Sequence, residues 1–218
     1  SSKLSAWISL GCISPRKIYH EVRLFEEKVM KNDSTYWVIF ELIWRDYFHL
    51  VALKYGIRLF KRSGIQHDMI KNWRQNKDEF DKWVNGQTGV PFVDANMREL
   101  KQTGYMANRG RQIVASFFTK DLKLEWWWGA MYFESVLIDY DVCSNWGNWN
   151  YIAGIGNDPI PNRYFHVLKQ AEKYDGDAHY VKHWVQELKD LDFDAIKKLY
   201  EFKRNISLNY PSPIVKLP

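Results

Sequence analysis

The sequence has 218 residues and a formal net charge of +5, with 31 Lys and Arg against 26 Asp and Glu. This length suits one domain that buries enough surface to fold without disulfides. The two cysteines cannot form a disulfide framework, no run of about 18 apolar residues is present, and the N-terminus has no signal-peptide pattern. We therefore expect an intracellular protein of a reducing compartment, with no membrane partner and with Cys12 and Cys143 buried. The basic charge permits an anionic partner such as nucleic acid.

Helical periodicity dominates the chain, and no segment alternates convincingly with a period of two. Helix starts are expected at Ser14-Pro15 and Asp33-Ser34. Beyond the second start, apolar residues recur at helical spacing toward Gly56: Tyr36, Ile39, Phe40, Ile43, Tyr47 and Val51. Further helices are predicted at 66–85 with a break, 93–103, 108–119, 126–137, 162–174, 178–190 and 194–203. The prediction is an all-α fold with one core over 1–208, then an extended tail over 209–218.

A second face of the helix after Asp33 combines charged and aromatic side chains. Its members are Glu41, Trp44, Arg45 and Phe48. Polar side chains on both sides of an aromatic ring suggest a face that meets something other than solvent. The simpler interpretation of Glu41 and Arg45 is an i,i+4 ion pair worth about 0.3–0.5 kcal/mol.

The sequence lacks the common motifs of nucleotide-binding and hydrolytic enzymes. The sequence has no Gly-rich dinucleotide fingerprint, no phosphate-binding lysine loop and no serine nucleophile elbow. His179 and His183 have i,i+4 spacing, but no third ligand accompanies them at a known distance, so no metal site is predicted. The aromatic content of 17% is unusual. Most of these rings must form core, and some could stack on a flat cofactor, stack on bases or carry electrons.

One segment, Asp139–Tyr151, concentrates polar and aromatic residues. Asp139 and Asp141 precede Asn145, Trp146 and Trp149, between an apolar helix and a glycine-rich loop. Polar groups in such surroundings must be hydrogen-bonded. They either form a network within the protein or hold a buried polar ligand.

At this segment the sequence resembles the FAD-binding helical domain of the cryptochrome and photolyase family, and within it cryptochrome DASH. Several blocks match in order, from Ser1 to about Leu188. They are Ser2–Ser5 with Ser14–Arg16, Glu41–Phe48, Gly86–Leu100, Asn108–Gln112 and Asp139–Tyr151. After Lys189 the sequence departs from the family pattern. The family's N-terminal antenna domain has no counterpart here, so we predict no antenna pigment unless a separate chain supplies that domain.

The resemblance implies one FAD and gives its binding residues. The diphosphate loop matches Ser1, Ser2, Lys3, Leu4 and Ser5, whose hydroxyls, backbone N–H groups and one cation suit an anion. Positions around the flavin and sugar match Asn108, Arg111, Asp139, Tyr140, Asp141 and Asn145. Arg111 is expected to pair with Asp139, and a plain buried salt bridge is the simpler alternative. Asn145 matches the position opposite flavin N5, where a neutral amide favours the repair-type redox state over a signalling cryptochrome.

The resemblance also implies an electron-transfer chain and a substrate cavity. The chain matches Trp149, Trp126 and Trp73. Trp127 and Trp128 depart from the family pattern and are expected to be core or interface. The cavity for a flipped pyrimidine dimer matches Glu41, Trp44, Arg45, Asn108, Arg109 and Tyr151. Gln112 and Tyr151 fit the DASH pattern.

Together these matches imply blue-light-driven repair of cyclobutane pyrimidine dimers, mainly in single-stranded DNA, with Glu41, Asn145 and the three tryptophans as the catalytic residues. A non-catalytic flavin-binding light or redox sensor, a nucleic-acid-binding module and a scaffold without flavin remain alternatives.

Overall fold

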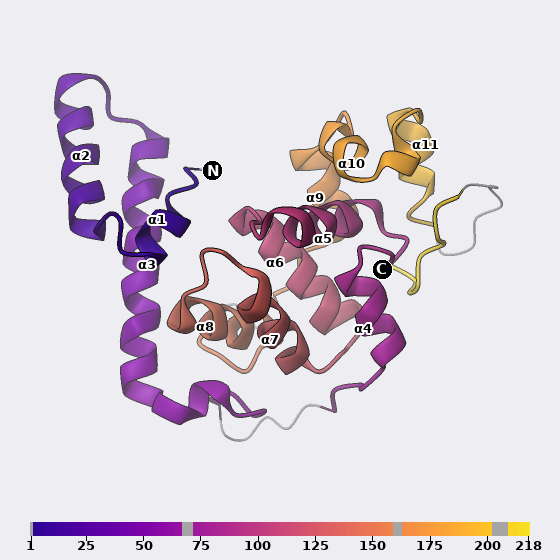
Figure 1. Cartoon of the computed structure of the whole chain (residues 1–218), viewed down its shortest axis with the longest axis horizontal. Helices are drawn as coiled ribbons and strands as arrows, with labels where there is room; N and C mark the ends of the chain where they lie inside the picture. The colour runs from indigo at the N-terminus through magenta and orange to yellow at the C-terminus, as the bar shows by residue number, and fades with distance from the viewer. Residues whose placement is uncertain (1, 67–71, 159–162, 202–208) are drawn as a thin grey trace.

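The computed structural model describes residues 2–66, 72–158, 163–201 and 209–218. Within these ranges the chain is helical, and its β-type pairing is an isolated bridge between Arg74 and Leu124. The helices, labelled in Figure 1, are α1 (Ser5–Ser9), α2 (Pro15–Lys28), α3 (Asp33–Tyr55), α4 (Lys77–Val84), α5 (Pro91–Thr103), α6 (Asn108–Ser116), α7 (Trp126–Val136), α8 (Val142–Ala153), α9 (Val167–Tyr174), α10 (His179–Trp184) and α11 (Phe193–Lys198). Short 3-10 turns cover Gly56–Phe60 and Gln186–Leu188, and a π-helix covers Phe117–Asp121. The predicted all-α class is confirmed.

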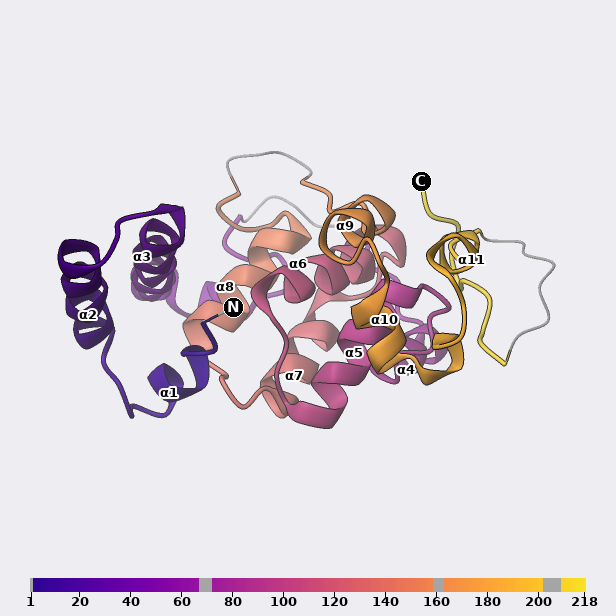
Figure 2. The same ribbon diagram turned by 90° about the horizontal axis from the view of Figure 1, so that it is seen from above.

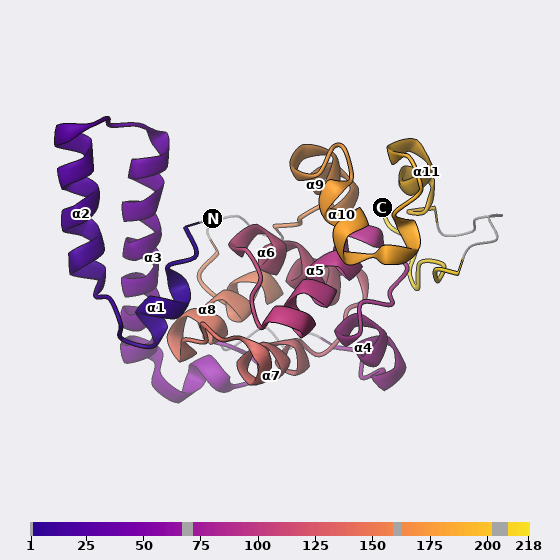
Figure 3. The same ribbon diagram turned by 45° about the horizontal axis from the view of Figure 1, so that its top comes forward.

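Helices α2 and α3 form a hairpin at one end of the molecule (Figures 1 and 3). The Ser14 hydroxyl caps α2 by accepting from the Lys17 backbone N–H at 3.1 Å, as expected. Asn32 caps α3 through a reciprocal capping box with Thr35. The apolar stripe on α3 is buried only toward its end: Val51 is 6% exposed, whereas Ile43 is 59% exposed. The hairpin therefore joins the core through the C-terminal half of α3.

The core lies between α4, α5, α6, α7 and α8, and α9–α11 cover its other end (Figure 2). Large side chains such as Trp83, Met97 and Trp126 are fully buried there. Helices α3 and α8 approach closely at Gly147, where an added Cβ would lie 2.3 Å from the Phe48 ring. This close approach places the C-terminal half of α3 alongside the middle of α8.

The tail 209–218 contains no helix or strand and packs back on the loop before α5. The Tyr210 hydroxyl donates to the Asp94 carboxylate at 2.5 Å, and the Ile214 N–H donates to the Thr88 carbonyl at 2.9 Å. Asp94 also accepts from the Thr88 hydroxyl and from the N–H groups of Thr88 and Gly89. One buried carboxylate thus joins the tail, the 86–90 loop and α5.

The structure corrects several expectations. Of the helical stretch predicted over 66–85 with a break, only α4, from Lys77, is helical in the described residues. Residues 72–76 run past Leu124 in an isolated bridge, and residues 67–71 lie outside the described ranges. The segment 178–190 divides into α10 and a 3-10 turn, and α11 is shorter than 194–203. The predicted burial of both cysteines is wrong: Cys12 is exposed and Cys143 is only partly buried. Helices α1 and α8 were not predicted.

Candidate functional site

Arg111 on α6 and Asp139 after α7 form a short ion pair, with 2.6 Å between the guanidinium and Asp139 Oδ2. The Arg111 Nε–H donates to the Met106 carbonyl at 2.7 Å, which fixes the guanidinium. The expected pairing is therefore present. Asp139 Oδ1 is also buried, but it has no hydrogen-bond partner among the described residues. An unpartnered buried carboxylate oxygen is costly, so this atom marks a place where a bound ligand can donate a hydrogen bond.

The N-terminal segment lies near this pair. The Ser9 hydroxyl of α1 donates to the Tyr140 carbonyl at 2.7 Å. Lys3 Nζ lies 6.0 Å from the centre of the Tyr105 ring, and the Arg111 guanidinium lies 5.9 Å from the same ring. Two cations therefore lie close to one aromatic ring beside Asp139, in surroundings that suit an anionic group. Ser2 and Ser5 are exposed, Leu4 is partly buried, and Ser1 lies outside the described residues.

Two amide side chains on α6 and α8, Gln112 and Asn145, were also expected to belong to the site or to the family pattern. Asn145 is 9% exposed, and its Nδ2 donates to the Ala130 carbonyl at 3.1 Å, which holds the side chain in one orientation. Gln112 Oε1 is buried and has no hydrogen-bond partner among the described residues. Asn108, at the start of α6, is exposed. Gln112 Oε1 is thus a second buried acceptor without a described partner, on the helix that also carries Arg111.

Asp141 caps α8, because its Oδ1 accepts from the Ser144 backbone N–H at 2.8 Å. Its Oδ2 faces His49 Nε2 on α3 at 3.5 Å. Burial raises the pKa of the neighbouring Tyr140 to about 12, so its hydroxyl stays protonated at neutral pH. The cap explains why α8 begins where it does, and the spacing Asp-x-x-Ser before an aromatic run is the signal that could have predicted it.

An aromatic and charged surface spans α3 and α8. The Trp44 and Tyr151 rings meet edge to face at 6.5 Å, and the Arg163 guanidinium lies 5.3 Å from the Tyr151 ring. Glu41 is on the Trp44 side of α3; partial burial raises the pKa of its carboxyl, and the nearby Arg109 charge opposes that shift. This surface brings together residues more than a hundred positions apart. Sequence reasoning missed Arg163, which no motif marks.

The remaining expected site residues are placed as follows. Arg45 forms an ion pair with Asp46 at 3.2 Å, where an i,i+4 pair with Glu41 was the simpler expectation. The Arg109 guanidinium lies over Tyr174 at 5.3 Å, on α9. Sequence reasoning also missed Tyr174 and Tyr105, two further rings that contact cations of the site.

The three tryptophans of the expected chain come from three segments: Trp149 from α8, Trp126 from the start of α7, and Trp73 from the stretch before α4. Trp149 is 2% exposed and Trp126 is fully buried, whereas Trp73 is partly buried in the segment before α4. The described ring contacts of Trp149 include Phe133 at 5.2 Å and Trp83 at 6.3 Å. Those of Trp126 are with Trp127 at 6.3 Å and Trp146 at 5.7 Å. Trp127 and Trp128 pack against the core, as expected.

Comparison with known proteins gives consistent results. Residues 37–218 match a family described as the FAD binding domain of DNA photolyase. A cryptochrome DASH of Synechocystis is 52% identical over 99% of this chain and 45% of its own length. A Synechocystis cryptochrome crystal structure superposes with a TM-score of 0.92 at 52% identity, over 99% of this chain and 46% of that one. An archaeal photolyase structure from Sulfolobus tokodaii, with two FAD molecules, has a TM-score of 0.82 at 39% identity, over 99% and 47%.

The chain therefore spans less than half the length of the relatives that it matches. No helix in the described ranges has both the length and the apolar character that crossing a bilayer would need. Residues 1, 67–71, 159–162 and 202–208 lie outside the described ranges, and Ser1 is the expected site residue among them.

Proposed function

Because this chain belongs to the cryptochrome and photolyase family and is its FAD-binding domain, we propose that it acts in blue-light-driven repair of cyclobutane pyrimidine dimers. The preferred substrate under this proposal is single-stranded DNA. The observation that carries it is the surface across α3 and α8, where Trp44, Tyr151 and Arg163 meet beside Glu41.

The residues of the site fit FAD. Asp139 Oδ1 and Gln112 Oε1 are buried acceptors with no hydrogen-bond partner among the described residues, and a flavin carries a ring N–H and ribityl hydroxyls that can donate to such atoms. Lys3 and Arg111 supply positive charge for the diphosphate or for a reduced ring. When bound and reduced, FAD supplies one photoexcited electron to the dimer and receives it back after the ring opens.

The protein positions the two partners and stabilises charge. Arg111, held by Asp139 and by the Met106 carbonyl, would lower the energy of negative charge next to it. Asn145 adds an amide, which is neutral and does not titrate. Its orientation is fixed because Nδ2 donates to the Ala130 carbonyl. No side chain has to act as an acid or base for the bond breaking.

The DNA side would use aromatic faces and cations. Stacking of an extruded base on an aromatic ring contributes about 1–3 kcal/mol per base. The free-energy cost of extruding the base is lower when the DNA is already single-stranded. Trp44 and Tyr151 provide such rings, and Arg163 and Arg109 provide cations for phosphates. Glu41 provides a carboxyl acceptor for the N–H edge of a pyrimidine. The formal charge of +5 agrees with a polyanionic substrate.

The test uses the full chain loaded with FAD and reduced in the dark. Blue light is then given in the presence of an oligonucleotide with one thymine dimer, in single-stranded and duplex forms, and restored thymine is measured. We expect faster repair of the single strand. Stable flavin binding without repair of either form would overturn the proposal and favour a light or redox sensor.

A further inference from the structure

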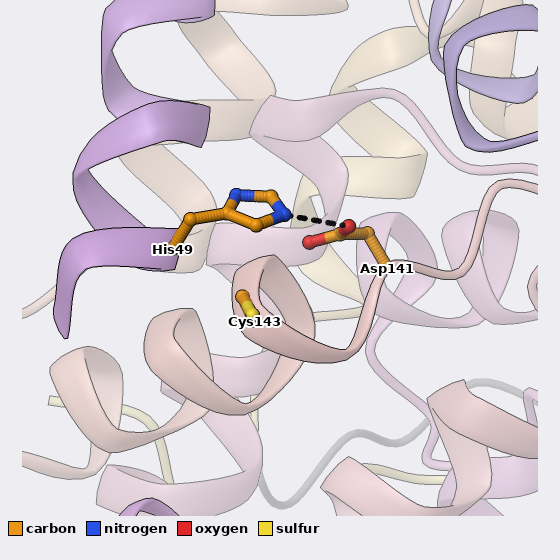
Figure 4. A group of neighbouring side chains, drawn as sticks. All are labelled: His49, Asp141 and Cys143. Carbon is orange, nitrogen blue, oxygen red and sulfur yellow. Dashed lines mark ion pairs between the residues drawn. The ribbon is translucent and has the colours of Figure 1, made fainter. Parts of the chain in front are cut away.

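A mixed group of potential metal ligands lies at the contact between α3 and α8. His49 comes from α3, Asp141 precedes α8, and Cys143 lies in the first turn of α8 (Figure 4). One ligand atom from each of the three residues lies within 4.8 Å of the others. Asp141 also matches an expected FAD-binding position, whereas His49 and Cys143 belong to neither the FAD site nor the DNA surface. This combination of imidazole nitrogen, carboxylate oxygen and sulfur is the donor set of a borderline-soft divalent ion.

The orientation of His49 is that of a metal ligand. Its Nδ1 lies 2.8 Å from the Arg45 carbonyl, one turn earlier on α3, so the Nδ1–H donates there and the Nε2 carries the free lone pair. Ligating histidines are typically held in this way by a bond from the other ring nitrogen. Figure 4 shows the ring edge with Nε2 turned toward Asp141. The lone pair is thus directed at the centre of the group.

Asp141 has one oxygen available. Its Oδ1 caps α8 by accepting from Ser144, while Oδ2 lies 3.5 Å from His49 Nε2. A charge-assisted hydrogen bond would be about 2.7–2.9 Å, so this pair is separated by more than a direct bond requires. Two ligands at about 2.1 Å from a tetrahedral zinc ion are roughly 3.4 Å apart. The His–Asp separation already fits an ion between them, and the Cys143 sulfur lies within 4.8 Å of both ligand atoms.

We propose that His49, Asp141 and Cys143 form a binding site for a zinc-class divalent ion, with a water molecule as the fourth ligand. A neutral imidazole, a carboxylate and a thiolate balance the charge of such an ion, so the complex is close to neutral. Thiolate and imidazole ligands disfavour Mg²⁺ and Ca²⁺, which prefer oxygen. The bound ion links α3 to α8 and thereby stiffens the contact that positions Trp44 beside Tyr151.

The thiol must lose its proton to bind. A cysteine binds a zinc-class ion as the thiolate, so binding to Cys143 releases its thiol proton. Arg45 is engaged with Asp46 at 3.2 Å, which reduces its repulsion of a cation.

The experiment titrates the metal-free full chain with zinc sulfate against a chromophoric chelator. We expect one ion per chain, with at least tenfold weaker binding in Cys143→Ser and in His49→Gln. Cys12→Ser is the matched control, because Cys12 is exposed and outside the group; its affinity should not change. Cobalt(II) gives a second readout, since a thiolate ligand produces a sulfur-to-cobalt charge-transfer band that Cys143→Ser should abolish.

A substoichiometric titration, or equal affinity in wild type and Cys143→Ser, would overturn the site. Circular dichroism of each variant separates loss of a ligand from loss of folding. Should Cys143→Ser not fold, Cys143→Ala replaces it, because alanine removes the thiol and is the residue most compatible with a helix. The flavin absorbance of the same samples is recorded separately, so loss of metal binding is distinguishable from failure of the repair proposal.

Discussion

Asp139 is bonded to Arg111 through one carboxylate oxygen and keeps the other buried without a described partner. The pair lies between α6 and the start of α8, within residues 37–218, which match the FAD binding domain of DNA photolyase. A carboxylate used in this way holds the guanidinium on one side and can accept a hydrogen bond from a ligand on the other. The arrangement predicts that stability and flavin binding both depend on it.

Asp139→Asn should lower the free energy of unfolding by roughly 2–4 kcal/mol, because a partly buried Arg111 loses its anionic partner. FAD affinity should fall at least tenfold. Denaturant unfolding and titration of flavin fluorescence measure the two effects. Glu187→Gln is the control, since it breaks the Arg98–Glu187 pair on another part of the surface and should leave FAD affinity unchanged. Wild-type FAD affinity in Asp139→Asn would contradict the role.

Much of the fold was readable from the sequence because its signals are local. Ser14-Pro15 and the residues around Asp33 mark helix starts through side-chain caps, and both starts are correct. Helix α8 was missed because four polar residues and a glycine mask its periodicity, although Asp141 caps it. Residues 72–76 were wrongly included in a helix because their partner, Leu124, is about fifty positions away. Non-local pairing of this kind leaves no periodic trace.

The site also contains some features that the sequence predicted and others that it could not predict. The Arg111–Asp139 pair was expected from the resemblance, and the structure contains it. The contact of Arg163 with Tyr151 could not be predicted, because it depends on the path of a loop. The burial of Cys143 was overestimated, since an apolar neighbourhood in sequence does not reveal which face of a helix is covered.

The close contact of α3 and α8 should make Gly147 intolerant of any side chain. An added Cβ would overlap the buried Phe48 ring, which cannot move freely. Gly147→Ala should lower the free energy of unfolding by about 1–3 kcal/mol and reduce repair by separating Trp44 from Tyr151. Asn148→Ala, exposed on the next position of α8, should change stability by less than about 0.5 kcal/mol. Equal denaturation midpoints for the two variants would refute the packing argument.

Trp149→Phe should slow photoreduction of oxidised FAD at least tenfold, because an indole is more readily oxidised than a benzyl ring. Repair by enzyme that is reduced beforehand should be nearly unchanged. The substitution is conservative in a pocket formed by Gly129, Phe133 and Phe118. Trp184→Phe, on α10, is the control. Transient absorption under blue light measures photoreduction, and an unaltered rate in Trp149→Phe would remove this residue from electron supply.

Glu41→Gln should keep FAD but reduce dimer repair by about tenfold, because the substrate loses a charged acceptor worth about 1.5–3 kcal/mol per hydrogen bond. Surrounding protein raises the pKa of Glu41, so protonation should begin at a higher pH than for an exposed glutamate. Repair should accordingly decline as the pH falls into the acid range, and this decline should be absent in Glu41→Gln. Glu27→Gln on α2 is the matched control. A wild-type repair rate in Glu41→Gln would exclude the contact.

The Asp94 carboxylate predicts a particular pH dependence of stability. Burial raises the pKa of Asp94 to about 6, against the hydrogen bonds from Thr88 and Tyr210, which lower it. The unfolded value is about 3.9. Because the folded pKa is the higher one, the folded state binds the proton more tightly. This contribution to stability is therefore fully present below about pH 4 and is lost as the pH rises through about 6.

Asp94→Asn removes the titrating group. The difference in unfolding free energy between wild type and Asp94→Asn should therefore shrink by up to about 3 kcal/mol from pH 4 to pH 7. Denaturant midpoints across this range measure it. Asp78→Asn, at a side chain 73% exposed, should show a difference that is nearly constant. A constant difference for Asp94→Asn as well would mean that the carboxylate joining Tyr210 to the 86–90 loop is ionised throughout, held by its donors despite its burial.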